Sequence, residues 1–235
     1  MKIRYQIVWS FLILVFSNVS LPQTSQDCGV SNGPVLARQV CDADIRNAKV
    51  SWGKTHIIWL LPRVFSSVKT PAGISLKYPR TPELDPLCDF TPNSFILRDI
   101  LDKAITVQPQ YKWSEENGVI NVTPLDDYPI LGTHIKKFRG VNITRTEALN
   151  QLLNLKNFER YFVGNGLREG DDVFIGPTGR MAEKKISIDL RNVTVTDVLN
   201  EIVRQDGNSM WIYSEMETQN TEDTVRYYKL TISHL

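Results

Sequence analysis

The feature that most constrains the fold is a segment that occurs twice in the chain. Residues 142–153 align without a gap with residues 192–203, at an offset of 50 (192 − 142), and five aligned positions are identical. Both copies begin with a capping-box pattern, in which a hydroxyl and a carboxylate satisfy the free amides at a helix start. The pairs are Thr144 with Glu147 and Thr194 with Asp197. Apolar residues follow at helical spacing, so each copy predicts an amphipathic helix.

A third copy of the helix pattern lies upstream. Residues 99–102 match residues 197–200 at an offset of 98 (199 − 101), and the same offset places Trp113 on Trp211 (211 − 113). In both places a helix is therefore followed, after the same interval, by a strand that carries a tryptophan.

Strand patterns surround these helices. Asn117-Gly118 separates two strand-like runs within residues 111–122, which predicts a β-hairpin because both residues tolerate positive φ. A second hairpin with a longer polar loop, residues 215–224, follows the last helix, and an alternating strand, residues 186–190, precedes it. The repeated order of strand, helix and hairpin predicts an α+β fold. We expect two small tandem units, each a short sheet packed by one or two helices.

The amino terminus has the layout of a secretory signal peptide. Lys2 and Arg4 precede an almost continuous apolar run over residues 7–16, and this run is too short to span a bilayer. We therefore expect export to the periplasm, with secretion as the alternative, and no transmembrane segment in the mature chain. Removing both basic residues leaves 25 Lys and Arg against 26 Asp and Glu, a net charge of −1. Such a chain has no field that would attract nucleic acid.

These patterns divide the chain into predicted segments. They are a signal peptide over residues 1–24, a cysteine-bearing segment over 25–55, a first unit over 56–124, a linker over 125–133 and a second unit over 134–235.

The three cysteines are Cys28, Cys41 and Cys88. An oxidising compartment favours one disulfide and leaves one thiol. A bond from Cys28 to Cys41 would close a short loop, whereas one from Cys41 to Cys88 would join the amino-terminal segment to the first unit. The spacing leaves the pairing open. Because no CxxC or paired histidine accompanies the cysteines, we expect no metal and no cofactor.

No set of residues in the sequence has the spacing of a catalytic site. The three histidines, His56, His134 and His234, stand far apart. Two pairs of neighbouring carboxylates, Asp126-Asp127 and Asp171-Asp172, would point in opposite directions on an extended chain. The alternative to a binding protein is an exported glycan- or peptide-active hydrolase that uses carboxylates near the glycine-rich loop over residues 164–183.

Residues from about 56 to 123 resemble the short amino-terminal domain of secretins and TonB-dependent receptors, called STN. The matching pattern is a helix near residues 62–70, the strand Gly73-Ile74-Ser75-Leu76, a helix near 97–105 and the hairpin over 111–122. Residues from about 134 to 235 resemble a second, diverged copy with an expanded middle. The resemblance implies protein–protein contact in the periplasm. Neither a secretin channel nor a receptor barrel follows, so we expect a free-standing tandem.

Four aromatic residues lie on the equivalent strands: Tyr111, Trp113, Trp211 and Tyr213. They can pack as core under the helices, or the outward members can form a contact surface for a peptide strand or a glycan. The functional prediction is an exported, non-catalytic binding module whose partner is another envelope protein. Pairing at a sheet edge is the expected mode of contact. The oligomeric state is not predicted.

Overall fold

The computed structural model describes most of the chain beyond residue 52. The described residues are 36, 38, 53–55, 57–77, 88–90, 96–170, 183–219 and 224–235. Residues 53–55, 57–59, 88–90, 218 and 219 are described by their backbone alone. The predicted signal peptide, Cys28, Cys41, His56 and the pair Asp171-Asp172 lie outside the described residues, and so does any disulfide that would involve the first two cysteines.

Helices and strands follow each other along the described chain in a mixed order. The helices are α2 (Ile57–Val68), α3 (Leu97–Val107), α4 (Arg145–Leu153), α5 (Lys156–Gly164) and α6 (Val195–Asp206). The strands are β1 (Gly53–Thr55), β2 (Ala72–Lys77), β3 (Cys88–Phe90), β4 (Tyr111–Glu116), β5 (Val119–Pro124), β6 (His134–Ile143), β7 (Leu167–Glu169), β8 (Ile186–Thr194), β9 (Ser209–Gln219) and β10 (Thr224–His234). The predicted α+β class is confirmed.

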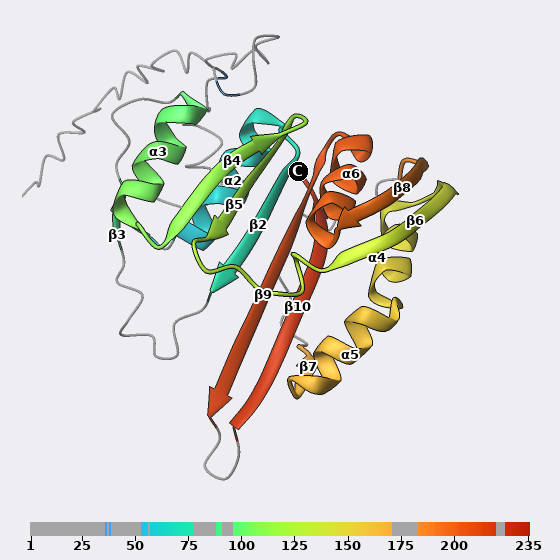
Figure 1. The fold of residues 1–235 in the computed structure, drawn as a ribbon. Coiled ribbons are helices and arrows are strands. Elements are labelled where there is room, and N and C mark those ends of the chain that lie inside the picture. The colour runs from blue at the N-terminus through green and yellow to red at the C-terminus, as the bar shows by residue number, and fades with distance from the viewer. Residues whose placement is uncertain are drawn as a thin grey trace, which may run out of the picture.

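A six-stranded sheet in the order β4-β5-β2-β9-β10-β7 runs through the middle of the molecule (Figure 1). Strand β2 pairs in parallel with β9, from Ala72 opposite Met210 to Lys77 opposite Glu215. Strands of the two predicted units therefore share one sheet, where the sequence pattern suggested one short sheet for each unit. The β9–β10 hairpin continues past this contact, and β7 pairs in parallel with β10 there, from Arg226 opposite Leu167 to Tyr228 opposite Glu169.

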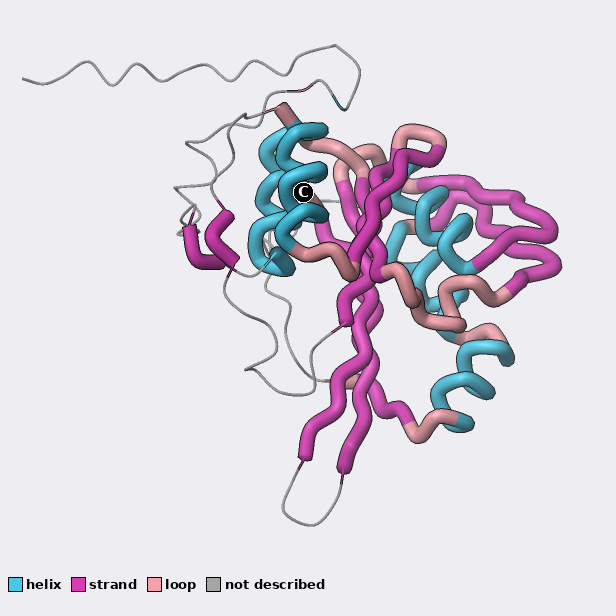
Figure 2. The backbone as a smooth tube through the Cα atoms, turned by 60° about the vertical axis from the view of Figure 1, so that its left-hand side comes forward, coloured by secondary structure: helices cyan, strands magenta, loops and turns pink. Residues whose placement is uncertain are grey.

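Helices cover both faces of this sheet (Figure 2). Each face has its own hydrophobic core. On β9, Met210 and Ile212 pack in a core with α2 and α3, while Trp211 and Tyr213 pack in a second core with α4, α5 and α6. Side chains alternate between the two faces of a strand, so a strand covered on both faces is apolar throughout. This explains the continuous burial of β9 from Ser209 to Ser214.

The offset of 50 found in the sequence is visible in the backbone. Both predicted capping boxes are formed, at Thr144 with Glu147 and at Thr194 with Asp197. The residue two positions before each cap has a left-handed conformation, with φ of 54° at Asn142 and 52° at Asn192. The repeated segments β6–α4 and β8–α6 thus begin their helices in the same way.

The two repeated segments also contact each other symmetrically. Strands β6 and β8 form a separate antiparallel pair in which Arg139 lies opposite Asp189. These two residues are themselves related by the offset (189 − 139 = 50). An antiparallel pair centred on equivalent positions has a local two-fold relation, so the repeat packs against its own copy.

Candidate functional site

Three of the four predicted contact aromatics lie in the protein core. Trp211 and Tyr213 have no exposed surface, and Tyr111 is 6% exposed. Of the two alternatives, packing in the core therefore holds for these three residues. Residues two positions apart share one face of a strand, so the two members of a pair do not point to opposite faces. Trp113 is half-buried, and it remains the one aromatic of this set at the surface.

Both tryptophans are held by the same hydrogen bond. The Trp211 Nε1 donates to Asn200 Oδ1 at 2.8 Å, and the Trp113 Nε1 donates to Asp102 Oδ1 at 2.9 Å. Asp102 and Asn200 are equivalent at the offset of 98, as are the two tryptophans. The second copy is buried, where a neutral amide avoids the cost of burying a charge. The bonds therefore support the repeat and give the aromatics a structural role.

A cluster around Glu215 ties the shared sheet to α5. The Glu215 carboxylate side chain is 8% exposed, and its Oε1 accepts hydrogen bonds from the hydroxyls of Tyr213 at 2.7 Å and Tyr161 at 2.8 Å. Arg226 lies 3.4 Å from the second oxygen, and the backbone N–H of Glu215 donates to the Tyr128 hydroxyl at 3.3 Å. These contacts satisfy the carboxylate internally, which is the arrangement of a structural group.

The tyrosines of this cluster stay protonated over a wide pH range. Burial is the main cause that raises the pKa of Tyr128, Tyr161 and Tyr213 above its ordinary value, and the negative charge of Glu215 raises each pKa further. The sequence signal for this cluster was the alternation of Tyr213 and Glu215 on one strand face, but only the fold brings Tyr128 and Tyr161 to it.

The predicted carboxylate pair Asp126-Asp127 does not form a joint site. Asp127 Oδ1 accepts a hydrogen bond from the Ser75 hydroxyl at 2.8 Å, while Asp126 pairs with Lys77 at 2.6 Å in an exposed salt bridge. Among the described residues no group of His, Cys, Asp and Glu is placed to hold a metal ion. No helix in the described part of the chain is long and apolar enough to cross a membrane.

Strand β4 forms an edge of the central sheet. It pairs with β5, and no other described strand pairs with it. Its residues Lys112, Ser114, Glu115 and Glu116 are exposed, whereas β5 is buried along its whole length. An exposed edge strand of this kind fits the predicted mode of contact.

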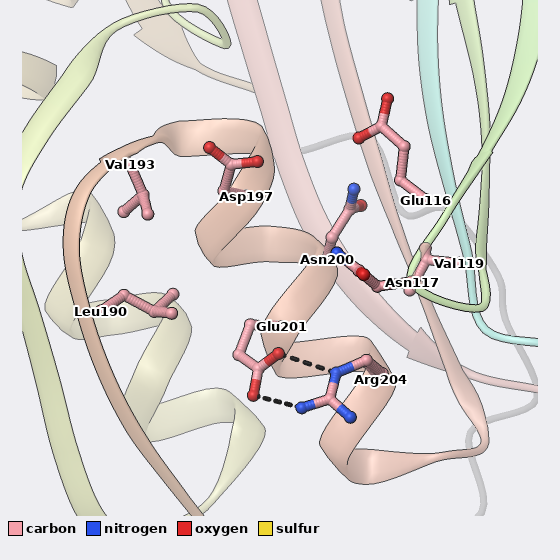
Figure 3. Close-up of a pocket in the computed structure, with 9 residues that line it drawn as sticks. All are labelled: Glu116, Asn117, Val119, Leu190, Val193, Asp197, Asn200, Glu201 and Arg204. Atoms are coloured by element: carbon pink, nitrogen blue, oxygen red, sulfur yellow. Dashed lines mark hydrogen bonds and ion pairs between the residues drawn. The ribbon is translucent and has the colours of Figure 1, made fainter.

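A pocket of about 270 Å³ lies between the β4–β5 turn, β8 and α6 (Figure 3). Residues on both sides of the junction between the two predicted units line it. They are Glu116, Asn117 and Val119 from the β4–β5 hairpin, Leu190 and Val193 from β8, and Asp197, Asn200, Glu201 and Arg204 from α6. The pocket thus exists only because the shared sheet brings the turn of the first unit against a helix of the second.

Comparisons with known proteins give no relative. No protein-family model, no curated protein and no solved structure matches the chain. The resemblance to STN domains therefore stays a prediction from the sequence pattern.

Proposed function

We propose that the chain is an exported, non-catalytic binding module that receives an extended segment of another envelope protein on the edge strand β4. The observation that carries this proposal is the exposed, one-sided pairing of β4, which pairs with β5 alone among the described strands. An unpaired edge presents backbone donors and acceptors to which a partner strand can add.

The direction of the backbone groups identifies which residues of β4 would bind. The backbone N–H of Ile120 donates to the carbonyl of Pro71 at 3.1 Å, so it faces β2 and not β4. Glu115 lies opposite Ile120 and therefore belongs to a pair without mutual hydrogen bonds. Its own N–H and C=O face away from β5, and by alternation so do those of Trp113.

The side chains of β4 suit an edge strand that binds a specific partner and resists uncontrolled association. Lys112 and Glu115 are exposed charges, which discourage the uncontrolled association of sheet edges. Trp113 is fixed by its bond to Asp102 and offers a rigid, half-buried aromatic surface beside the edge. Rigid aromatic residues are enriched in protein interfaces because they bury much area at a small entropic cost.

We propose a non-catalytic role because the carboxylates of the described clusters are bound to other residues of the chain. The Glu215 cluster is saturated by internal hydrogen bonds, and Asp126 and Asp127 bind different residues. The predicted resemblance to STN domains, which implies protein contact in the periplasm, points in the same direction.

Two substitutions at one position test the proposal. Glu115→Pro removes the outward backbone donor, and proline is tolerated on an edge strand where its nitrogen faces solvent. Glu115→Ala removes the charged side chain but keeps the donor. We expect a partner that co-purifies from the envelope fraction with the natural chain and with Glu115→Ala, and that is lost with Glu115→Pro.

Thermal unfolding of both variants controls for folding. A folded Glu115→Pro variant that retains the partner with unchanged affinity would refute pairing at β4.

A further inference from the structure

The pocket between the β4–β5 turn, β8 and α6 is lined by the side-chain amide of Asn200 (Figure 3). Asn200 is 7% exposed, and its Oδ1 is occupied by the Trp211 indole N–H at 2.8 Å. This bond fixes the orientation of the amide, and the Asn200 side chain lines the pocket. None of the described residues accepts a hydrogen bond from its Nδ2. The Nδ2 donors are therefore available to a ligand or to water.

A second donor lies one turn further along α6. Arg204 binds Glu201 through Nε at 2.8 Å and through Nη2 at 2.7 Å. Hydrogen bonds from Arg204 lower the pKa of Glu201, so this carboxylate stays ionised and the pair is internally neutral. The Nη1 group of Arg204 has no acceptor among the described residues.

The acceptors of the pocket are two carboxylates. Asp197 Oδ2 accepts the capping bonds from the backbone N–H of Thr194 at 2.7 Å and from its hydroxyl at 2.8 Å, and this leaves Oδ1 open. Glu116 is exposed at the opposite wall, where its contact is the Ser114 hydroxyl at 3.4 Å. Val119, Leu190 and Val193 supply apolar surface between these polar groups.

The mixture of groups selects the ligand chemistry. A cation would satisfy Glu116 and Asp197 but would leave the donors of Asn200 unused and would face Arg204. An anion would satisfy the donors and be repelled by the carboxylates. A hydroxyl group donates one hydrogen bond and accepts others, so several hydroxyls on one ring can satisfy both sets.

The size of the pocket limits the ligand further. Pockets for drug-sized ligands occupy roughly 300–1,000 Å³, and this pocket of about 270 Å³ lies below that range. Its apolar residues can pack against the C–H groups of a ring. We propose that this pocket binds a single sugar residue. The pocket would recognise hydroxyl groups, whereas the β4 edge would recognise a peptide backbone.

The test uses the full mature chain labelled with ¹⁵N. The probes are glucose, galactose, mannose and N-acetylglucosamine, with Nα-acetyl-lysine amide and acetate as a cation and an anion. The signal is the side-chain amide of Asn200, assigned by its loss in an Asn200→Leu variant. We expect at least one sugar to shift this signal saturably, and both charged probes to leave it unchanged.

A carboxylate variant then locates the site. Glu116→Ala removes an open acceptor, and one hydrogen bond to a charged group is worth about 1.5–3 kcal/mol, so affinity should fall roughly 10- to 100-fold. Glu159→Ala removes an exposed carboxylate on α5 and should leave affinity unchanged. The proposal is overturned if no sugar shifts the Asn200 signal, if only the lysine amide or acetate does, or if Glu116→Ala binds as tightly as Glu159→Ala.

Discussion

The contact between Gly73 and Trp211 tests whether the two halves of the chain share one sheet. Gly73 on β2 lies directly opposite Trp211 on β9, and the indole packs over the glycine backbone. A methyl group built on Gly73 would overlap the ring atoms Cε2, Cζ2 and Nε1 of Trp211. The ring has no exposed surface, and its nitrogen is bound to Asn200, so it has little freedom to move.

We expect Gly73→Ala to lower the free energy of unfolding by about 3 kcal/mol. Overpacking of a buried site costs typically about 1–3 kcal/mol, and the fixed ring places this site at the upper end. For a chain of this size each kcal/mol corresponds to about 2–4 °C in Tm, so Tm should fall by roughly 6–12 °C. Urea denaturation and calorimetry measure both quantities.

A double-mutant cycle identifies the ring as the cause. Trp211→Leu removes the overlapping atoms and by itself costs about 3 kcal/mol, at the lower end for large-to-small changes of a buried tryptophan. In that background Gly73→Ala should cost nothing, or stabilise by up to about 1 kcal/mol by restricting the unfolded chain. The two changes should therefore be coupled by about 3 kcal/mol.

Gly132→Ala is the matched control. The nearest atom to an added Cβ there is the carbonyl oxygen of Pro129, at 3.8 Å, which is ordinary van der Waals contact. Its effect should stay within about 0.5 kcal/mol. The reasoning is refuted if Gly73→Ala is as stable as the natural chain, or if its cost is the same with and without the indole of Trp211.

Two further predictions concern local features of the fold. Burial raises the pKa of Tyr128, Tyr161 and Tyr213 in the folded state, so above pH ~10 the unfolded chain binds fewer protons than the folded chain. The free energy of unfolding should therefore fall there by up to about 1.4 kcal/mol per pH unit for each tyrosine. A urea titration that finds this free energy constant from pH 9 to 11 would contradict the prediction. Thr194→Ala removes the cap of α6 and should lower the free energy of unfolding by about 1 kcal/mol, and Thr144→Ala should do the same at the equivalent cap of α4. Thr194→Ser keeps the hydroxyl and should be nearly neutral. Equal stability of Thr194→Ala and Thr194→Ser in urea would argue against the cap.

Part of the candidate site could be predicted from the repeat. The offset of 98 aligns Asp102 with Asn200 as well as Trp113 with Trp211, so the shared hydrogen bond between helix and strand had a signal in the sequence. Helix α5 was not predicted, although Phe158 and Phe162 at helical spacing form its buried face. Its short apolar pattern is interrupted by charged residues, and the cluster around Glu215 and the second core hold it in place.

The sequence alone determined the local structure of this protein. Capping boxes at Thr144 and Thr194 and the turn at Asn117-Gly118 depend on interactions among a few neighbouring residues, so their chemistry can be read directly from the chain. Only the tertiary structure decided that β2 pairs with β9. That pairing places Trp211 inside a core and brings Glu116 toward Asn200, because contacts between residues distant in sequence depend on how whole elements pack and not on any local pattern.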